Sequence, residues 1–227
     1  MKKPTVPAAL ALTLASLVLT APAAAPQARA QPAAESSCGN LLSKVSDLLG
    51  RTEFLRARFR HTLRSRALGQ DEVEEGVLVL ARGGRMRWEY SAPQGKLALS
   101  DGRNSYLYLP DQKTVYVQPL PQGKEAPLPL RLLMGDVRLE KEFRCEGLIP
   151  KGSLAELLLA PVEPVEGVGK VRITVEASTG EVREVRYEDA LGNEVSLSLE
   201  AVEHPAMVPA ALFRFVPPEG CRIVQGG

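Results

Sequence analysis

Residues 85–90 read RMRWEY, and the strict alternation of charged and apolar side chains in this stretch decides the fold. Successive side chains of a β-strand point to opposite faces of a sheet, so the pattern predicts a strand with one wet face and one apolar face. Met86, Trp88 and Tyr90 would lie on the apolar face. Residues 55–60, LRARFR, repeat the pattern and predict the first strand of the same sheet.

Short segments of this kind, separated by turn residues, continue to the C-terminus. Asp101-Gly102, Thr179-Gly180 and Gly192-Asn193 supply residues that accept positive φ in tight hairpins. The sequence therefore predicts a mainly β fold with short helices, in which about 11–12 strands form one curved antiparallel sheet. The further strand candidates are residues 74–81, 85–91, 96–100, 105–109, 114–118, 139–145, 154–159, 171–176, 182–188, 194–201 and 213–216.

One face of this sheet is expected to be apolar throughout. Such a face must be buried against another layer, against itself by closure of the sheet, or against a ligand. Periodicity alone fits a packed core as well as a cavity wall, so both interpretations of Trp88 stay open at this point. The residues predicted to line the apolar face, and any cavity on it, are Phe59, Leu78, Leu80, Met86, Trp88, Tyr90, Leu97, Leu99, Val115, Val117, Ile173, Leu197 and Phe213.

Two segments are available to cover this face. Residues 38–49 place apolar side chains three and four positions apart, which predicts an amphipathic helix that ends at Gly50. Residues 119–135 are proline-rich and then apolar, which predicts a loop with a short helix. Two short helices can hardly fill a barrel of this many strands, so a lid over a partly unfilled cavity stays open beside an ordinary packed core. The lid candidates are Leu41, Leu42, Val45, Leu48, Leu128, Leu132, Leu133 and Met134.

The N-terminus predicts export from the cytoplasm. The pair Lys2-Lys3 precedes an apolar stretch at residues 8–19, and the small-residue site Ala28-Arg29-Ala30 follows. This is typical of a cleaved signal peptide over residues 1–30, which leaves a single domain over residues 31–227 in the periplasm. The apolar stretch is shorter than the roughly 20 residues that a transmembrane helix needs.

The composition argues against several classes of function. Lys and Arg number 28 against 27 Asp and Glu, so the basic excess that drives nucleic-acid binding is missing. The chain has two histidines and no metalloprotease, hydrolase or phosphate-binding motif. We therefore expect neither an enzyme nor a metal or cofactor site.

The three cysteines are Cys38, Cys145 and Cys221. They would meet an oxidising compartment, in which one pair is expected to close and one thiol to remain. The sequence leaves open which pair that is. No cysteine lies in a C-x-x-C motif, so a structural bond is favoured over redox catalysis.

Six segments, in order along the chain, resemble the LolA family of periplasmic outer-membrane lipoprotein carrier proteins. The family pattern has a strand that ends in arginine, an aromatic strand, a proline, and an S-D-G-K/R turn before a further aromatic strand. The resemblance covers nearly all of the chain beyond the signal peptide. The segments are GVLVLAR at 76–82, MRWEY at 86–90 followed by Pro93, SDGR at 100–103 followed by Tyr108, LLMG at 132–135, DALGN at 189–193 and FRFVPPEG at 213–220.

The resemblance implies an unclosed antiparallel β-barrel with a helical lid over an apolar cavity. It also implies a monomeric chaperone that receives triacylated lipoproteins from an inner-membrane Lol-type ABC transporter and delivers them to an outer-membrane LolB-like receptor. The family's functional arginine matches Arg82, which would hydrogen-bond backbone carbonyls of the lid in the empty state. Gly83 and Gly84 stand where a proline usually follows, and this departure affects the expected geometry of Arg82. A solvated arginine at a strand end is the other interpretation.

Two other functions with the same half-barrel remain alternatives. A LolB-like outer-membrane receptor would itself be lipidated, but Glu35-Ser36-Ser37 before Cys38 does not resemble the signal for lipid attachment. A LolA-like sensor, or a carrier of free lipids or glycolipids, would share the apolar cavity. The nature of the cargo would distinguish it from a lipoprotein carrier.

Overall fold

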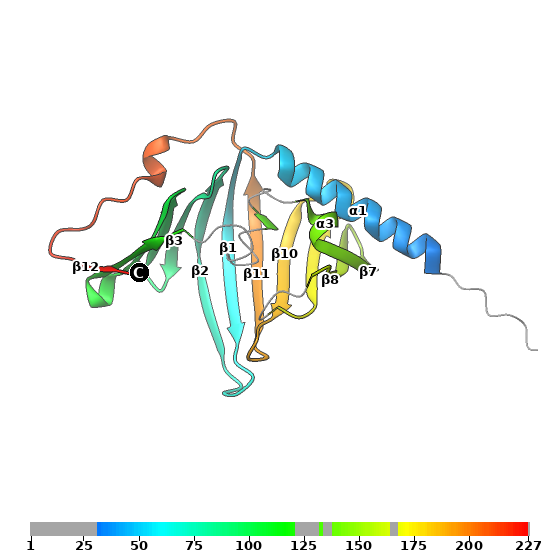
Figure 1. Cartoon of the computed structure of the whole chain (residues 1–227), viewed down its shortest axis with the longest axis horizontal. Helices are drawn as coiled ribbons and strands as arrows, with labels where there is room; N and C mark the ends of the chain where they lie inside the picture. Colours follow the sequence, from blue (N-terminus) through cyan, green and yellow to red (C-terminus); the bar gives the residue numbers. More distant parts are fainter. Residues whose placement is uncertain (1–30, 121–131, 134–137, 164–167, 227) are drawn as a thin grey trace, which may run out of the picture.

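In the part of the chain that the structure describes, a single curved sheet forms the body of the molecule, and helices α1 and α3 lie along one side of it (Figure 1). The computed structural model describes residues 31–120, 132–133, 138–163 and 168–226, so the predicted signal peptide lies outside the described residues. The elements are α1 (Gln31–Arg51), β1 (Phe54–Arg64), β2 (Asp71–Ala81), β3 (Arg85–Ala92), β4 (Leu97–Asp101), β5 (Asn104–Leu109), η1 (Pro110–Gln112), β6 (Thr114–Pro119), α3 (Leu139–Glu142), β7 (Phe143–Lys151), β8 (Leu154–Pro161), β9 (Val171–Glu176), β10 (Val182–Glu188), β11 (Glu194–Glu203), η3 (Ala210–Phe213) and β12 (Arg222–Gln225).

The described strands make one sheet with the order β12-β6-β5-β4-β3-β2-β1-β11-β10-β9-β8-β7. Strands β1 to β6 form a meander on one side of β1, and β7 to β11 form a second meander that returns to pair with it. The pairing of β12 with β6 is parallel, whereas the pairs within both meanders are antiparallel. Strands β12 and β7 end the order without pairing to each other. The prediction of an unclosed sheet of about 11–12 strands is confirmed.

Alternation along the strands gives the sheet two different faces. In β1 the apolar residues 55, 57 and 59 are buried, and the arginines between them are exposed. We call the face that carries Phe59 and Trp88 the inner face and the opposite one the outer face. The interpretation of residues 55–60 as a strand with one wet side is therefore confirmed.

Helix α1 packs its apolar side onto the inner face, over the half of the sheet formed by β7 to β10 (Figure 1). Leu42 and Val45 are almost fully buried in the same core cluster as Leu157 and Ile173. Burial of each such side chain contributes about 1.5–3 kcal/mol. The predicted helix at residues 38–49 is confirmed, and it extends seven residues further toward the N-terminus, to Gln31.

Two contacts hold α1 to β7 and to the turn after β9. Cys38 of α1 forms a disulfide with Cys145 of β7, while Cys221 remains a free thiol. The Lys44 ammonium donates hydrogen bonds to the backbone carbonyls of Ala177, at 3.3 Å, and Ser178, at 3.1 Å. The expected pair and single thiol are both present, and the structure supplies the pairing that the sequence left open.

The predicted strand at residues 139–145 is wrong in its first half. Leu139–Glu142 forms the short helix α3, and β7 begins at Phe143. Glutamate and lysine favour helix over strand. The backbone N–H of Leu139 also donates to the Ser46 hydroxyl of α1, at 3.1 Å, which satisfies a donor that a helix start leaves free. A contact with a distant element thus sets the beginning of α3.

The predicted strand at residues 213–216 is also wrong. Phe213 ends the 3-10 helix η3, and the last strand is β12 at Arg222–Gln225. Pro217 and Pro218 follow directly, and prolines cannot donate the hydrogen bonds of a ladder. Phe215 instead stacks on Tyr106 with ring centroids 4.9 Å apart, so the apolar alternation here reflects packing onto the sheet.

The disulfide is expected to contribute substantially to stability because it closes a long loop, with a sequence separation of 107 residues. Replacement of both Cys38 and Cys145 by serine should lower the free energy of unfolding by about 4 kcal/mol. Urea unfolding followed by circular dichroism would measure this loss. Cys221→Ser is the matched control and should change the free energy of unfolding by less than about 0.5 kcal/mol. Equal stability of the double variant and the parent protein would contradict the expectation.

Candidate functional site

A row of three aromatic rings crosses the inner face on β1 and β3. The Phe59 ring meets Trp88 edge-on at a centroid distance of 4.7 Å and Tyr90 at 5.2 Å. Gly76 on the intervening β2 makes room for this row, because a Cβ there would lie 2.9 Å from the Phe59 ring and 2.0 Å from the Glu89 carbonyl oxygen. A cleft of about 510 Å³ beside Gly76 touches Phe59 and Tyr90 but is lined mainly by outer-face residues such as Arg58 and Glu89.

The inner face and α1 bring many of the sequence-predicted residues into one apolar cluster. Tyr90 packs against this cluster as a partly buried residue, and Leu48 is half-buried. Leu128 and Met134 lie outside the described residues. The predicted residues within the cluster are Leu41, Leu42, Val45, Phe59, Leu78, Leu80, Met86, Trp88, Leu132, Leu133, Ile173 and Leu197.

Strands β4 and β6 do not place their predicted residues on the inner face. Trp88 pairs with Ala98, so Leu97 and Leu99 fall opposite Glu89 and Arg87 on the outer face. Through β5, the same registers place Val115 and Val117 on the outer face as well. The prediction of one shared face was wrong for these four residues, because a turn can shift the phase of alternation between two strands.

Phe213 also lies on the outer face. It is buried in a small separate cluster with Val79 and Ala81, and the Arg85 guanidinium lies 5.4 Å from its ring centroid. Val79 pairs with Arg87, which points away from the side of Trp88. The prediction that Phe213 lies on the inner face was therefore wrong. The segment that carries Phe213 packs on the outer side of the sheet and does not enter the sheet as a strand.

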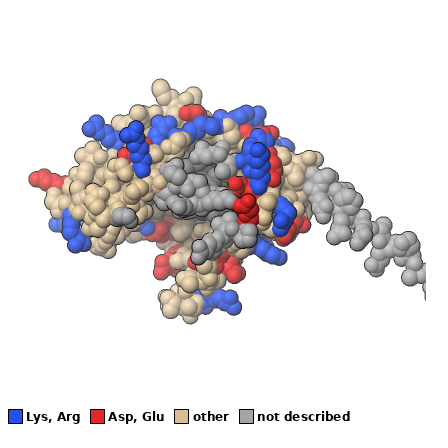
Figure 2. Space-filling model, in the orientation of Figure 1, with Lys and Arg blue, Asp and Glu red and all other residues tan. Residues whose placement is uncertain are grey.

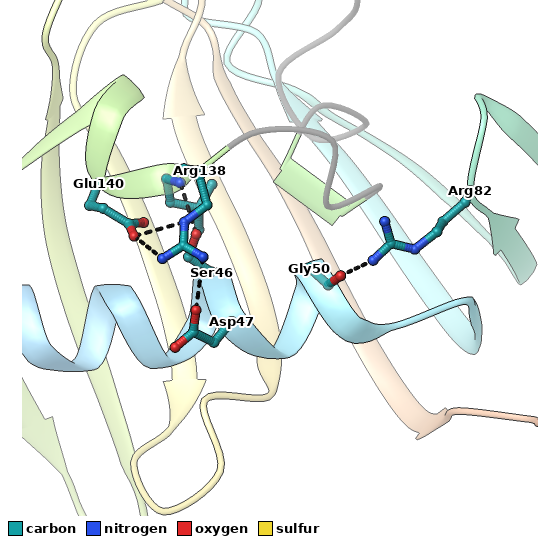
Figure 3. A network of polar contacts seen from close by, with 7 residues as sticks. Ser46, Asp47, Gly50, Arg82, Arg138 and Glu140 are labelled. Atoms are coloured by element: carbon teal, nitrogen blue, oxygen red, sulfur yellow. Dashed lines mark hydrogen bonds and ion pairs between the residues drawn. The ribbon is translucent and has the colours of Figure 1, made fainter.

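Arg82 connects the end of β2 to the end of α1 (Figure 3). Its guanidinium donates a hydrogen bond to the backbone carbonyl of Gly50, and its Nε lies 3.7 Å from the Glu53 carboxylate. Gly50 belongs to the last turn of α1, where carbonyls have no partner within the helix and a positive charge is favourable. We call this hydrogen bond the Arg82 latch. Arg82 thus bonds a carbonyl of the covering helix, as the resemblance implied.

A second polar network fixes the middle of α1 to α3 (Figure 3). Arg138 bonds Asp47 of α1 at 3.0 Å and Glu140 of α3 at 2.6 Å. Burial raises the pKa of Glu140, but hydrogen bonds from its own backbone and from Ser46, together with Arg138, lower it overall. No local pattern in the sequence indicates this network, because Asp47 and Arg138 lie 91 residues apart along the chain.

A polar cluster lies on the inner face beyond Tyr90. Lys96 forms an ion pair with Glu74, and the two side chains are only 18% and 24% exposed. The Lys96 ammonium lies 4.3 Å from the Tyr90 ring centroid, and the His61 Nδ1 lies 3.7 Å from the Glu74 carboxylate. Burial lowers the pKa of His61 despite Glu74 and raises the pKa of Tyr90 to about 12. Sequence reasoning missed this cluster, although the alternation of β1 indicated that His61 shares the face of Phe59.

Charged side chains of both signs are interspersed over the surface seen in Figure 2. On the outer face they pair across strands, as in Arg58 with Glu200 at 3.4 Å and Arg64 with Asp71 at 2.9 Å. Within the described residues no three His, Cys, Asp or Glu side chains are grouped so that they could hold a metal ion. No helix in the described part is both long and apolar enough to span a membrane.

The chain matches the family described as "Outer membrane lipoprotein carrier protein LolA" over residues 51–216. Outer-membrane lipoprotein carrier proteins of Chromobacterium violaceum and Dechloromonas aromatica are 29% and 28% identical to it. They cover 87% and 81% of this chain, and the matches span 91% and 86% of their own lengths. A crystal structure of an uncharacterized conserved protein from Thermus thermophilus shares the fold, with a TM-score of 0.53 at 13% identity over 84% of this chain and 99% of that one. The chain therefore belongs to the LolA family, whose members are lipoprotein carriers and not enzymes.

Proposed function

We propose that this protein works in the periplasm and shields the acyl chains of lipoproteins on the inner face of its sheet, beneath α1. The observation that carries this proposal is an apolar inner face whose cover is a separate helix. A separate helix can leave the face without breaking the hydrogen bonds of the sheet. The carrier names of the relatives support the same role.

The acyl chains of the cargo determine how large an apolar surface a carrier needs. Burial of an acyl chain is worth about 0.8 kcal/mol per CH₂, so three chains of about 16 carbons represent tens of kcal/mol against transfer through water. A carrier must offer a comparable apolar surface. The strands β1, β2, β3 and β8 to β11 supply it, because their inner-face residues form one contiguous cluster.

Helix α1 and the acyl chains would compete for this surface. Leu42, Val45 and Leu49 occupy the inner face in this structure, so cargo must displace them. Helix α1 is tied to the sheet covalently at two places, by the disulfide at Cys38 and by the two-residue connection to β1, and the Arg82 latch adds a polar contact at Gly50. Helix α1 would therefore have to shift or rotate on the inner face between these two attachments, with the Arg82 latch broken.

The proposed pathway runs from an inner-membrane ABC transporter to an outer-membrane LolB-like receptor. Closure of α1 over the inner face would expel cargo, which makes release favourable once a receptor offers another apolar site. The receptor role itself is not favoured for this chain, because the Cys38 sulfur forms a disulfide and so cannot carry a lipid anchor. A carrier of free lipids or glycolipids would need the same geometry. Identification of the bound cargo distinguishes that function from lipoprotein transport.

Protein purified from the periplasm should carry acylated polypeptides and should release lipoproteins from spheroplasts in a concentration-dependent manner. Mass spectrometry of the bound material identifies the cargo, and immunoblotting of the spheroplast supernatant measures release. Bound lipid without polypeptide would support the glycolipid alternative. A protein that neither binds acylated cargo nor releases lipoproteins would contradict the proposal.

Arg82→Leu removes the latch and should leave loading intact while slowing delivery. A charged hydrogen bond that is exposed to solvent contributes about 1 kcal/mol, so loss of the latch should reduce transfer to receptor-bearing membranes about fivefold. Transfer of labelled lipoprotein from the loaded carrier measures this rate. Arg51→Leu removes a neighbouring exposed charge at the end of α1 and should transfer like the parent protein. Normal delivery by Arg82→Leu would exclude the latch from the mechanism.

A further inference from the structure

The indole N–H of Trp88 is buried without a hydrogen-bond acceptor. Trp88 is only 9% exposed and belongs to the inner-face cluster. Among the described residues, the other buried side-chain atoms without a partner belong to Glu140, Glu181 and Arg186. Each of these three residues makes a polar contact through another of its atoms. Trp88 stands apart because Nε1 is its single polar atom.

This unpaired donor is costly where it lies. Removing an N–H from water without giving it an acceptor lowers stability, and native structures pair most such groups. The edge-on contact with Phe59 does not offset the cost, since an aromatic ring accepts an N–H only weakly. Phenylalanine at position 88 would cover most of the same apolar surface without the penalty. The N–H therefore points to an acceptor that binds from outside the protein.

The surroundings indicate which acceptor fits. Met86 lies on one side of Trp88 along β3, and Tyr90 lies on the other. Beyond Tyr90 the inner face becomes polar, with the Lys96–Glu74 ion pair against the Tyr90 ring. Along β3 the inner face thus changes from the apolar side chain of Met86 to the N–H donor of Trp88 and then to the charged groups beside Tyr90. An acylated molecule has the same order, with a hydrocarbon chain, a carbonyl and a polar head.

We propose that Trp88 Nε1 donates a hydrogen bond to the carbonyl oxygen of an ester or amide that joins an acyl chain to the cargo. This inference rests on the proposed carrier function and adds a specificity-determining residue to it. The inner face then distinguishes acyl cargo from alkyl chains of equal length, which apolar burial alone cannot do. The polar head of the cargo would lie toward Lys96 and Glu74.

The test compares two synthetic lipopeptides with the same peptide and chain length. One carries two palmitoyl esters on a glyceryl-cysteine, and the other carries two hexadecyl ethers, which lack the carbonyls. Isothermal titration calorimetry should give the parent protein about fivefold tighter binding to the ester, as expected for one net hydrogen bond. Trp88→Phe should bind both lipopeptides with equal affinity, close to that of the parent protein for the ether.

Leu99→Met is the matched control, because it changes a buried apolar residue of the neighbouring strand at similar volume but on the outer face. It should keep the fivefold preference for the ester. An ester preference that survives in Trp88→Phe would overturn the inference, and so would its absence in the parent protein. Failure to bind either lipopeptide would instead contradict the carrier function, and the inference would fall with it.

A second measurement needs no substitution, because the chain contains one tryptophan. In a ¹⁵N-labelled protein the indole group gives a single ¹H–¹⁵N signal. The ester lipopeptide should move the indole proton downfield and slow its exchange with water, whereas the ether lipopeptide should not move it downfield. Identical responses to both lipopeptides would exclude the hydrogen bond even if Trp88→Phe proved unstable.

Discussion

An unclosed sheet with one apolar face must bury that face against something other than itself, and this constraint governs the rest of the structure. In this protein α1 is the main cover among the described elements, and its apolar residues form a common core with strands from both meanders. A second sheet would bury the face permanently. A helix makes a smaller contact, which can be exchanged for an apolar ligand at comparable free energy. In the proposed carrier function, the stability of the empty protein and its affinity for cargo therefore depend on the same apolar surface.

The attachments of α1 therefore matter as much as its packing. A disulfide at Cys38 keeps the helix on the molecule in every state, and the contact of Arg138 with Asp47 orients it relative to α3. At the other end a single guanidinium bonds the carbonyl of Gly50. The chain also continues from this end into β1 after two residues, so both ends of the packed part of α1 are held covalently.

The sequence was sufficient for the strands and for the helix at residues 38–49, because both depend on local periodicity. It was insufficient wherever distant segments meet. Leu99 was assigned to the wrong face since nothing local fixes the phase of β4 relative to β3, and α3 begins where Ser46 of α1 supplies a hydrogen bond. The pairing of Cys38 with Cys145 is equally a property of the folded chain. Alternation predicted the burial of Trp88, but only the complete set of neighbours shows that its N–H is unpaired.

The two edge strands of the sheet explain how such a molecule can avoid edge-to-edge pairing with its own copies. Open sheets expose backbone donors and acceptors that invite strand addition and aggregation. At one rim the four-residue β12 covers the hydrogen-bonding side of β6, and a strand this short offers little template for another chain. At the other rim β7 has a register irregularity near Gly147 and carries Pro150 and Lys151, which discourage further pairing. The C-terminal residues of this chain thereby contribute to colloidal solubility.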